Sequence, residues 1–273
     1  MGPPAGCSRL PRESPMSTAA LHPDSFPSVC LRWSADRLPV EVMLIDQLEP
    51  GAGDRLIATA GLRQSRHPAF VDALDEPSAR LASMHPELAD PTSVYSFLVG
   101  PTGHPFHRHA GHRAFTAVSG SAGAQLRFAV TDDDACAADP QAFLRALRIV
   151  EVPADALFVV RFGGGTWHQF VPSDGAAHPA LFALSFHSNE LGGTLTEKQQ
   201  DAVRGNRADI PALTELLPAP MQRAWSAASD ARDSIPTTRL TLGRPVRATP
   251  RDPSTCMRKT SGGHPANRRG AVG

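Results

Sequence analysis

The chain has 273 residues, with 27 lysines and arginines against 27 aspartates and glutamates and a formal net charge of zero. That length can bury one substantial core with residues to spare, and the charge balance argues against nucleic acid or an anionic membrane as the main partner. Four scattered cysteines, no apolar run long enough to span a membrane and no apolar leader together predict a cytoplasmic protein without disulfides or membrane contacts.

The first part of the chain is predicted to be disordered and then to form one strand and two helices. Residues 1–28 are rich in proline and serine and cannot bury enough surface to offset the entropy lost on ordering. The apolar run from Val40 to Leu48 predicts a first strand. Pro68–Leu74 and Pro77–Met84 each open with proline and carry apolar residues at helical spacing, which predicts two short helices.

Short β-prone segments dominate the middle of the chain. Gly, Pro or Asp clusters separate them, as in a sandwich or small barrel. They are Val94–Val99, Ala114–Val118, Gln125–Val130, Ile149–Val152, Leu157–Arg161 and Leu181–His187. Asp139, as N-cap, and Pro140 begin a helix that runs to about Leu147.

Helical spacing returns in residues 196–236. Thr196–Val203, Ile210–Leu217 and Met221–Ala231 are predicted to be helices that pack on the outside of the β-structure. Residues 237–273 are basic and poor in large apolar side chains, so we expect a disordered, solvated tail rather than a nucleic-acid site. Neither end of the chain is expected to contribute to a binding pocket.

Histidines are concentrated between Gly103 and Gly120, as His104, His107, His109 and His112. His107 and His109 are two residues apart, so an extended strand points both imidazoles to the same face. A further histidine, His168, follows a glycine-rich turn at the start of a short strand. Because neutral imidazole is a common ligand of zinc, iron, copper and nickel, two strand-borne clusters of this kind predict a metal site.

These clusters resemble the two motifs of the cupin superfamily. The positions that fill the spacing of the motifs are His107, His109, Arg113 and Gly120 in the first, and Gly163, Gly165 and His168 in the second. The resemblance covers roughly residues 92–189. It implies an all-β core with the cupin double-stranded β-helix, or jelly roll, in a domain of residues 29–195 flanked by short helices and disordered termini.

The departures from the cupin pattern concern the acidic ligand above all. Where the family has a metal-binding glutamate, this chain has Arg113, a permanent cation that cannot bind a metal. The proline and the asparagine of the second motif are here Gly163 and Pro172. Two interpretations of Arg113 stay open: its guanidinium binds a substrate carboxylate or phosphate beside the metal, or it marks a barrel that has lost its metal because a cation repels a divalent ion.

The resemblance implies that His107, His109 and His168 bind a divalent metal ion, with Fe(II) favoured and Zn, Mn or Ni as alternatives. This ligand set is similar to that of the thiol dioxygenases, which use Fe(II) without a fourth carboxylate. We therefore expect a metal-binding cupin, a dioxygenase-type oxidoreductase acting on a small anionic substrate. The alternative is a non-catalytic small-molecule-binding or regulatory module that has lost its catalytic metal. The expected partners are this small molecule and, as a homodimer, a second copy of the chain.

Other polar residues near the motifs are weaker candidates. Alternation in the segment that ends at His187 places Ser185 and His187 on one face, which lines the pocket in a cupin barrel. We predict that both contact substrate and that His187 is a candidate proton donor, although a solvated strand end explains His187 equally well. His104 is expected in a solvated loop, and His112 on the face opposite His107 and His109.

Overall fold

Alternating burial gives each central strand one apolar face. In β2 (Val40–Gln47) the side chains of Val40, Val42 and Leu44 are fully buried, and the residues between them are half-buried. β8 (Ala124–Ala129) and β10 (Ala156–Phe162) alternate in the same way, and the buried side chains of all three strands belong to one hydrophobic core. This period of two is what a sheet with one buried face requires.

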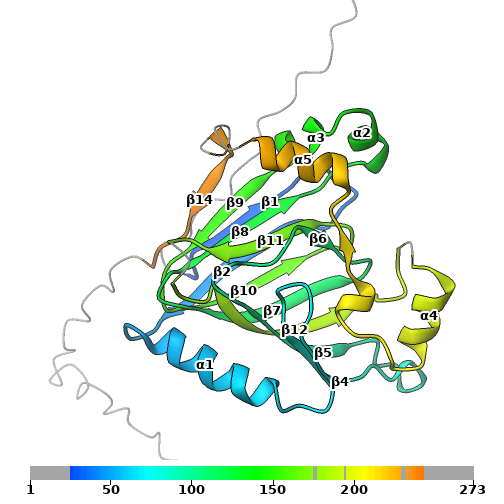
Figure 1. Cartoon of the computed structure of the whole chain (residues 1–273), viewed down its shortest axis with the longest axis horizontal. Coiled ribbons are helices and arrows are strands. Elements are labelled where there is room, and N and C mark those ends of the chain that lie inside the picture. The colour runs from blue at the N-terminus through cyan, green and yellow to red at the C-terminus, as the bar shows by residue number, and fades with distance from the viewer. Residues whose placement is uncertain (1–24, 175–176, 194, 229–231, 233, 243–273) are drawn as a thin grey trace, which may run out of the picture. The chain divides into compact units, whose positions relative to one another are not determined.

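The strands form two sheets on either side of this core (Figure 1). The computed structural model describes residues 25–174, 177–193, 195–228, 232 and 234–242. Within these residues the eight-stranded sheet has the order β1 (Ser28–Leu31), β2, β10, β7 (His112–Ser119), β12 (Leu181–Ser188), β5 (Ser93–Val99), β4 (Ser78–Ala82) and β3 (Phe70–Val71). The six-stranded sheet has the order β13 (Glu215–Leu216), β6 (His107–Arg108), β11 (Trp167–Pro172), β8, β9 (Arg148–Val152) and β14 (Thr237–Arg239).

The predicted all-β jelly roll is confirmed. The described strand pairs are antiparallel except for β14, which runs parallel to β9. All seven strands expected from the sequence form, with ends that differ from the expected ones by at most two residues; they are β2, β5, β7, β8, β9, β10 and β12. The sequence signal for these strands is strong because each has one face in the core.

Helices cover the outer faces of the two sheets. α1 (Ala52–Gln64) lies along the eight-stranded sheet (Figure 1), and Nε2 of its last residue donates a hydrogen bond to Ser96 Oγ of β5 at 3.0 Å. α2 (Asp133–Ala138), α3 (Gln141–Ala146) and α5 (Ala219–Ala227) lie beside the six-stranded sheet. There Phe143 of α3 and Trp225 of α5 form a second apolar cluster with the fully buried Trp167. α4 (Glu197–Arg204) has Thr196 as its N-cap and begins one residue after the predicted start.

Three expected helices are wrong. Pro68–Leu74 and Pro77–Met84 contain the strands β3 and β4, because the open edge of β5 offers hydrogen bonds that override the helical spacing. The third, Ile210–Leu217, forms a short 3₁₀ turn, η2 (Pro211–Leu213), and then β13, which pairs with β6. Another such turn, η1 (Pro86–Leu88), follows β4.

The prediction that residues 237–273 form a disordered tail is wrong for the first residues of this range. Thr237–Arg239 form β14, and Leu240 is only 1% exposed because it enters the main hydrophobic core. The average composition of the tail gives no sign that Leu240 is buried. The rest of the expected tail, residues 243–273, and most of the expected N-terminal segment, residues 1–24, lie outside the described residues.

Candidate metal centre

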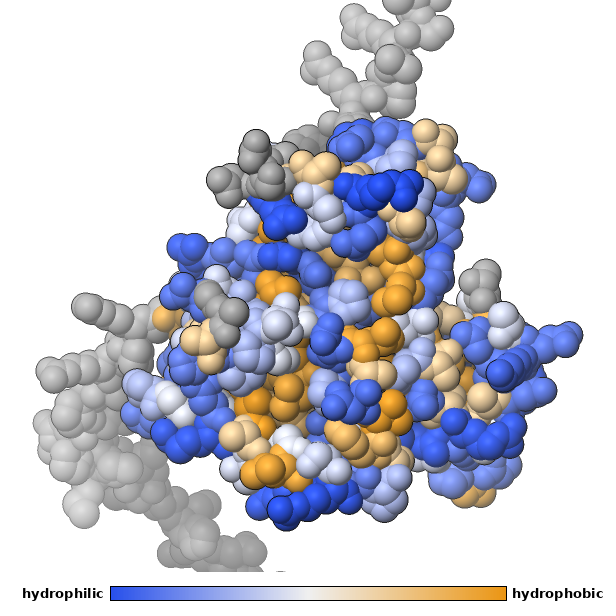
Figure 2. All heavy atoms as spheres, in the orientation of Figure 1, coloured by the Kyte–Doolittle hydropathy of each residue, from blue (hydrophilic) through white to orange (hydrophobic). Residues whose placement is uncertain are grey.

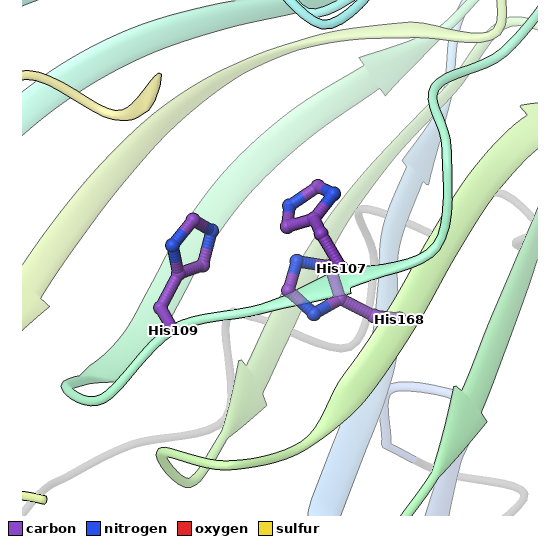
Figure 3. Close-up of side chains that lie close together, drawn as sticks. All are labelled: His107, His109 and His168. Carbon is purple, nitrogen blue, oxygen red and sulfur yellow. The ribbon is translucent and has the colours of Figure 1, made fainter. Parts of the chain in front are cut away.

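Pairing between two strands brings the histidines of the two motifs together. His107 of β6 and His168 of β11 are direct cross-strand partners, and their ring centroids are 4.2 Å apart. His109, two residues beyond His107, lies with its ring centroid 5.4 Å from that of His168. One ligand atom from each of the three buried side chains lies within 4.8 Å of the others. Figure 3 shows the three rings around a common space. Nitrogens bound to one ion at ~2.1 Å are roughly 3 to 4 Å apart, so small ring rotations would suffice to bind one.

Backbone carbonyls fix the orientation and the tautomer of all three rings. Nδ1 of His107 donates to the carbonyl of Pro105 at 3.0 Å, Nδ1 of His168 to that of Thr166 at 3.0 Å, and Nδ1 of His109 to that of Leu213 at 3.2 Å. A carbonyl oxygen only accepts hydrogen bonds, so each Nδ1 carries the proton and each Nε2 keeps its lone pair. This is the arrangement that presents a histidine to a metal.

Burial keeps these imidazoles neutral. The pKa values of His107, His109 and His168 lie well below the usual value, chiefly because burial disfavours the charged form; neighbouring histidines and Arg113 act in the same direction. At neutral pH the site therefore holds three uncharged nitrogen ligands without first having to release protons from them.

Arg108, the second residue of β6, lies between His107 and His109 in the sequence and anchors this very short strand. Its guanidinium forms ion pairs with Asp133 of α2 at 2.7 Å and with Glu215 of β13 at 2.8 Å. It also lies over the ring of Trp167, 4.3 Å from the centroid. The neighbouring His107 and His109 point into the protein, while the contacts of Arg108 fix the strand on its outer side. Sequence reasoning gave Arg108 no role.

His104 is not the solvated loop residue that the sequence predicts. It is 2% exposed, and both of its ring nitrogens are used: Nδ1 lies 2.9 Å from the carbonyl of Pro105, and Nε2 accepts from the amide of Phe170 at 3.1 Å. His104 is therefore buried beside the candidate ligands but has no lone pair to offer. His112 lies apart from the three ligands, as expected, and its Nδ1 accepts from the amide of Gly164 at 3.0 Å.

The opposite wall of the site belongs to the eight-stranded sheet. Arg113 of β7 and His187 of β12 are direct cross-strand partners, both buried. Oε1 of Glu190, just after β12, lies 3.0 Å from Arg113 Nη1 and 2.9 Å from His187 Nδ1. Arg113 is thus paired with an acidic side chain. His187 is buried rather than solvated, and its ring stacks on that of Tyr95 with centroids 4.4 Å apart.

The charges in this wall depend on one another. Burial, together with the charge of Arg113, lowers the pKa of His187 to about 4. Burial alone would raise the pKa of Glu190, but Arg113 and His187 hold it below its usual value. Arg113 and Glu190 therefore form a buried ion pair, with a neutral His187 hydrogen-bonding distance away. Glu190 was missed because nothing in its local sequence marks it.

A second buried carboxylate, Glu76, enters the site from the turn before β4. Its side chain is 6% exposed, and its Oε2 lies 3.6 Å from Nε2 of His107. Burial raises its pKa to about 8, although the nearby Arg113 acts in the opposite direction. Glu76 lies outside both motifs, and no sequence signal connects it with them.

A small cavity separates the two walls. Its polar lining comes from Glu76, His109, Arg113, His168, Ser185 and His187, and the remaining lining residues are apolar. Its volume is about 10 Å³, about the smallest space that holds one water molecule. Ser185, His187 and Arg113 all line this cavity. A single water-sized group fits this space, and a larger ligand requires side chains to move.

Comparisons with known proteins give only weak likenesses. No protein-family profile matches the chain, and no curated protein is similar to it. Solved structures that resemble it include the capsular polysaccharide assembling protein CapF from Staphylococcus aureus (14% identity, TM-score 0.32, 55% of this chain and 31% of that chain). Others are a mutant of the oxalate decarboxylase of Bacillus subtilis (12%, 0.33, 64% and 37%) and a cupin-2 domain protein from Rhodospirillum rubrum (18%, 0.28, 67% and 91%).

The chain thus spans only about a third of the length of the CapF and oxalate decarboxylase chains. At these TM-scores the likenesses carry no argument about function. The class follows from the molecule itself: a two-sheet jelly roll whose strands bring together the histidines of both motifs has the cupin fold. No helix in the described part of the chain is long and apolar enough to cross a membrane.

Proposed function

We propose that the protein is a metal-dependent cupin enzyme in which His107, His109 and His168 bind Fe(II), and that it oxidises a small anionic substrate with dioxygen. The observation that carries the proposal is the set of three buried imidazoles. Each has its Nδ1 proton donated to a backbone carbonyl, and their ligand atoms lie within 4.8 Å of one another. Such fixed, neutral rings are costly to bury unless their free nitrogens have a partner.

The donor set suits a catalytic ion better than a structural one. Structural zinc sites usually have four closed protein ligands, whereas three imidazoles leave positions open for other ligands. Bound there, Fe(II) would supply a centre at which dioxygen and a substrate can meet. Zn, Mn and Ni also bind imidazole, so the identity of the metal is a matter for experiment.

The eight-stranded wall offers groups that would orient an anionic substrate. Nη1 of Arg113 is engaged with Glu190, but its Nε and Nη2 are buried without a hydrogen-bond partner, as is Ser185 Oγ. Buried donors of this kind are costly unless a ligand accepts from them, and a guanidinium edge suits a carboxylate or a phosphate. In this proposal His187, held between Tyr95 and Glu190, would pass a proton to or from a substrate in the cavity.

The second candidate is a non-catalytic module that binds a small molecule in the same barrel. The small cavity favours it, since about 10 Å³ leaves little room for a substrate beside an ion. So does the cation at position 113, which disfavours a divalent ion nearby. The two candidates differ in metal content and in consumption of dioxygen.

The decisive measurement is the metal content of protein purified without a histidine tag, followed by oxygen uptake with small carboxylates and thiols. We expect about one iron per chain, lost in His107→Gln and His168→Gln. His85→Gln is the matched control, because His85 has an exposed side chain and faces Glu87 rather than the site. Wild-type protein that neither contains nor binds Fe(II) would leave the binding module as the function.

A further inference from the structure

We infer that Glu76 is the fourth ligand of the metal centre, so that the carboxylate missing from the first motif is supplied by the turn between β3 and β4. This inference rests on the proposed function, because it requires that the three histidines bind a metal. It adds a residue that neither motif contains.

The first observation is that two buried atoms, each able to bind a metal ion, face each other without a hydrogen-bond partner. Nε2 of His107 carries no proton, because Nδ1 donates to the carbonyl of Pro105. Oε2 of Glu76 lies 3.6 Å away, and both atoms are buried without a hydrogen-bond partner. That separation is too long for a hydrogen bond. It is close to the roughly 3 to 4 Å that separates two ligands of one ion. A cation between the two atoms would satisfy both.

The second observation is the distribution of charge. Arg113 occupies the position of the lost glutamate, but its charge is balanced by Glu190, 3.0 Å away. Glu76 has no comparable partner and shares the cavity with His109 and His168. A divalent ion bound by three neutral imidazoles would thus gain one negative ligand. Without Glu76, the ion would lie beside the Arg113–Glu190 pair, whose charges cancel, and it would have no negatively charged ligand.

The third observation is the backbone that delivers this side chain. Leu74 and Asp75, the two residues before Glu76, both have left-handed conformations, with φ of 57° and 55°. Such values are uncommon for residues other than glycine and are retained where the surrounding structure requires them. Directly after Glu76, the carbonyl of Pro77 accepts from the amide of Leu98, and Ser78 pairs with Phe97. The turn therefore fixes Glu76 in the interior.

The test is a titration of the metal-free protein with Co(II), read by the visible absorption of the bound ion. Glu76→Gln keeps the size of the side chain and removes the anionic ligand. We expect it to weaken Co(II) binding by at least about tenfold and to change the absorption spectrum of the bound ion. Glu41→Gln is the control, since this carboxylate pairs with Arg161 and neither residue lines the cavity; we expect it to retain the wild-type affinity and spectrum.

The unfolding midpoint of the metal-free protein separates a ligand from a structural residue. Because Glu76 has a buried oxygen without a partner, Glu76→Gln should unfold at the wild-type midpoint or above it. If that variant does not fold while Glu76→Ala does, the titration is made with Glu76→Ala. Wild-type Co(II) affinity and spectrum in the variant, or a lowered metal-free midpoint in both variants, would overturn the inference and leave the three-histidine site standing. Wild-type protein that binds no Co(II) or Fe(II) would overturn the proposed function as well.

Discussion

At position 113 a guanidinium stands where the cupin motif has a carboxylate. The side chains of Arg113 and Glu190 are each 3% exposed, and they lie 3.0 Å apart. Burying either charge alone is very costly, and the pair is tolerable because each neutralises the other. The substitution of the motif residue therefore has its compensation 77 positions later, in a residue that reaches the site only because β12 pairs with β7.

Removing one partner of this pair should destabilise the metal-free protein strongly. We expect Arg113→Gln and Glu190→Gln each to lower the free energy of unfolding by about 3 kcal/mol, because each leaves a buried charge unpaired. The double variant should be more stable than the sum of the two losses predicts. Urea unfolding of the four proteins in the presence of a chelator measures this coupling.

The exposed pair of Arg161 and Glu41, at 3.2 Å, is the matched control. Its side chains are 56% and 40% exposed, so its coupling should stay below about 1 kcal/mol. Equal coupling energies for the two pairs would contradict the role assigned to burial.

At the scale of secondary-structure elements, the glycine turn after β10 connects the two segments that carry the histidine motifs through hydrogen bonds from its backbone amides. The amide of Gly164 donates to His112 Nδ1 at 3.0 Å, and the amide of Gly165 donates to the carbonyl of His109 at 2.8 Å. A Cβ at Gly164 would lie 1.9 Å from the carbonyl oxygen of Ala110. The middle glycine of this turn, Gly164, thus allows the two histidine-bearing segments to contact each other.

Gly164→Ala should disturb both stability and the metal site. The added methyl must push the Ala110 backbone away, so we expect a loss of about 3 kcal/mol in unfolding free energy together with weaker Co(II) binding. Gly100→Ala is the control, because a Cβ there meets nothing within 4 Å. Thermal unfolding and the Co(II) titration test both effects; a Gly164→Ala variant that resembles Gly100→Ala would show that the turn has room to give.

The elements that the sequence predicts well are those whose pattern is local. Strand alternation and the His-x-His spacing each lie within a few residues, so β7 and the positions of His107 and His109 could be predicted. α1 was not predicted: its first turn is held by Asp155, whose carboxylate accepts from the amides of Gly51 and Gly53 across more than 100 positions. Glu76 and Glu190 were missed for the same reason, since only the pairing of distant strands gives them neighbours.

On the scale of the whole molecule, the C-terminal segment completes the barrel rather than only covering it. β13 pairs with β6, and the carbonyl of Leu213 in η2 orients the ring of His109. β14 extends the opposite edge of the same sheet. The face shown in Figure 2 has apolar side chains in its middle and mainly hydrophilic side chains around them. The segment after residue 196 is therefore part of the folded unit that holds the site.

Truncation at two positions tests how far this unit extends. A chain ending at Leu242 keeps β14 and the buried Leu240, and should unfold at the full-length midpoint. A chain ending at Pro236 loses the hydrogen bond from the Leu240 amide to the Glu151 carbonyl, 2.9 Å, and exposes the edge of β9. Losing one fully buried leucine alone costs about 1.5–3 kcal/mol, so its midpoint should fall by several degrees.

Truncation at Pro236 should lower stability but leave metal binding nearly unchanged. β14 lies at the edge of the six-stranded sheet remote from β13 and β6, so the chain ending at Pro236 should bind Co(II) with nearly full-length affinity at temperatures where it is folded. Calorimetry and the Co(II) titration on both truncated chains measure the two quantities. Equal midpoints for the two chains would show that β14 adds nothing to the barrel. A large loss of Co(II) affinity with an unchanged midpoint would show that residues after Pro236 act on the metal centre itself.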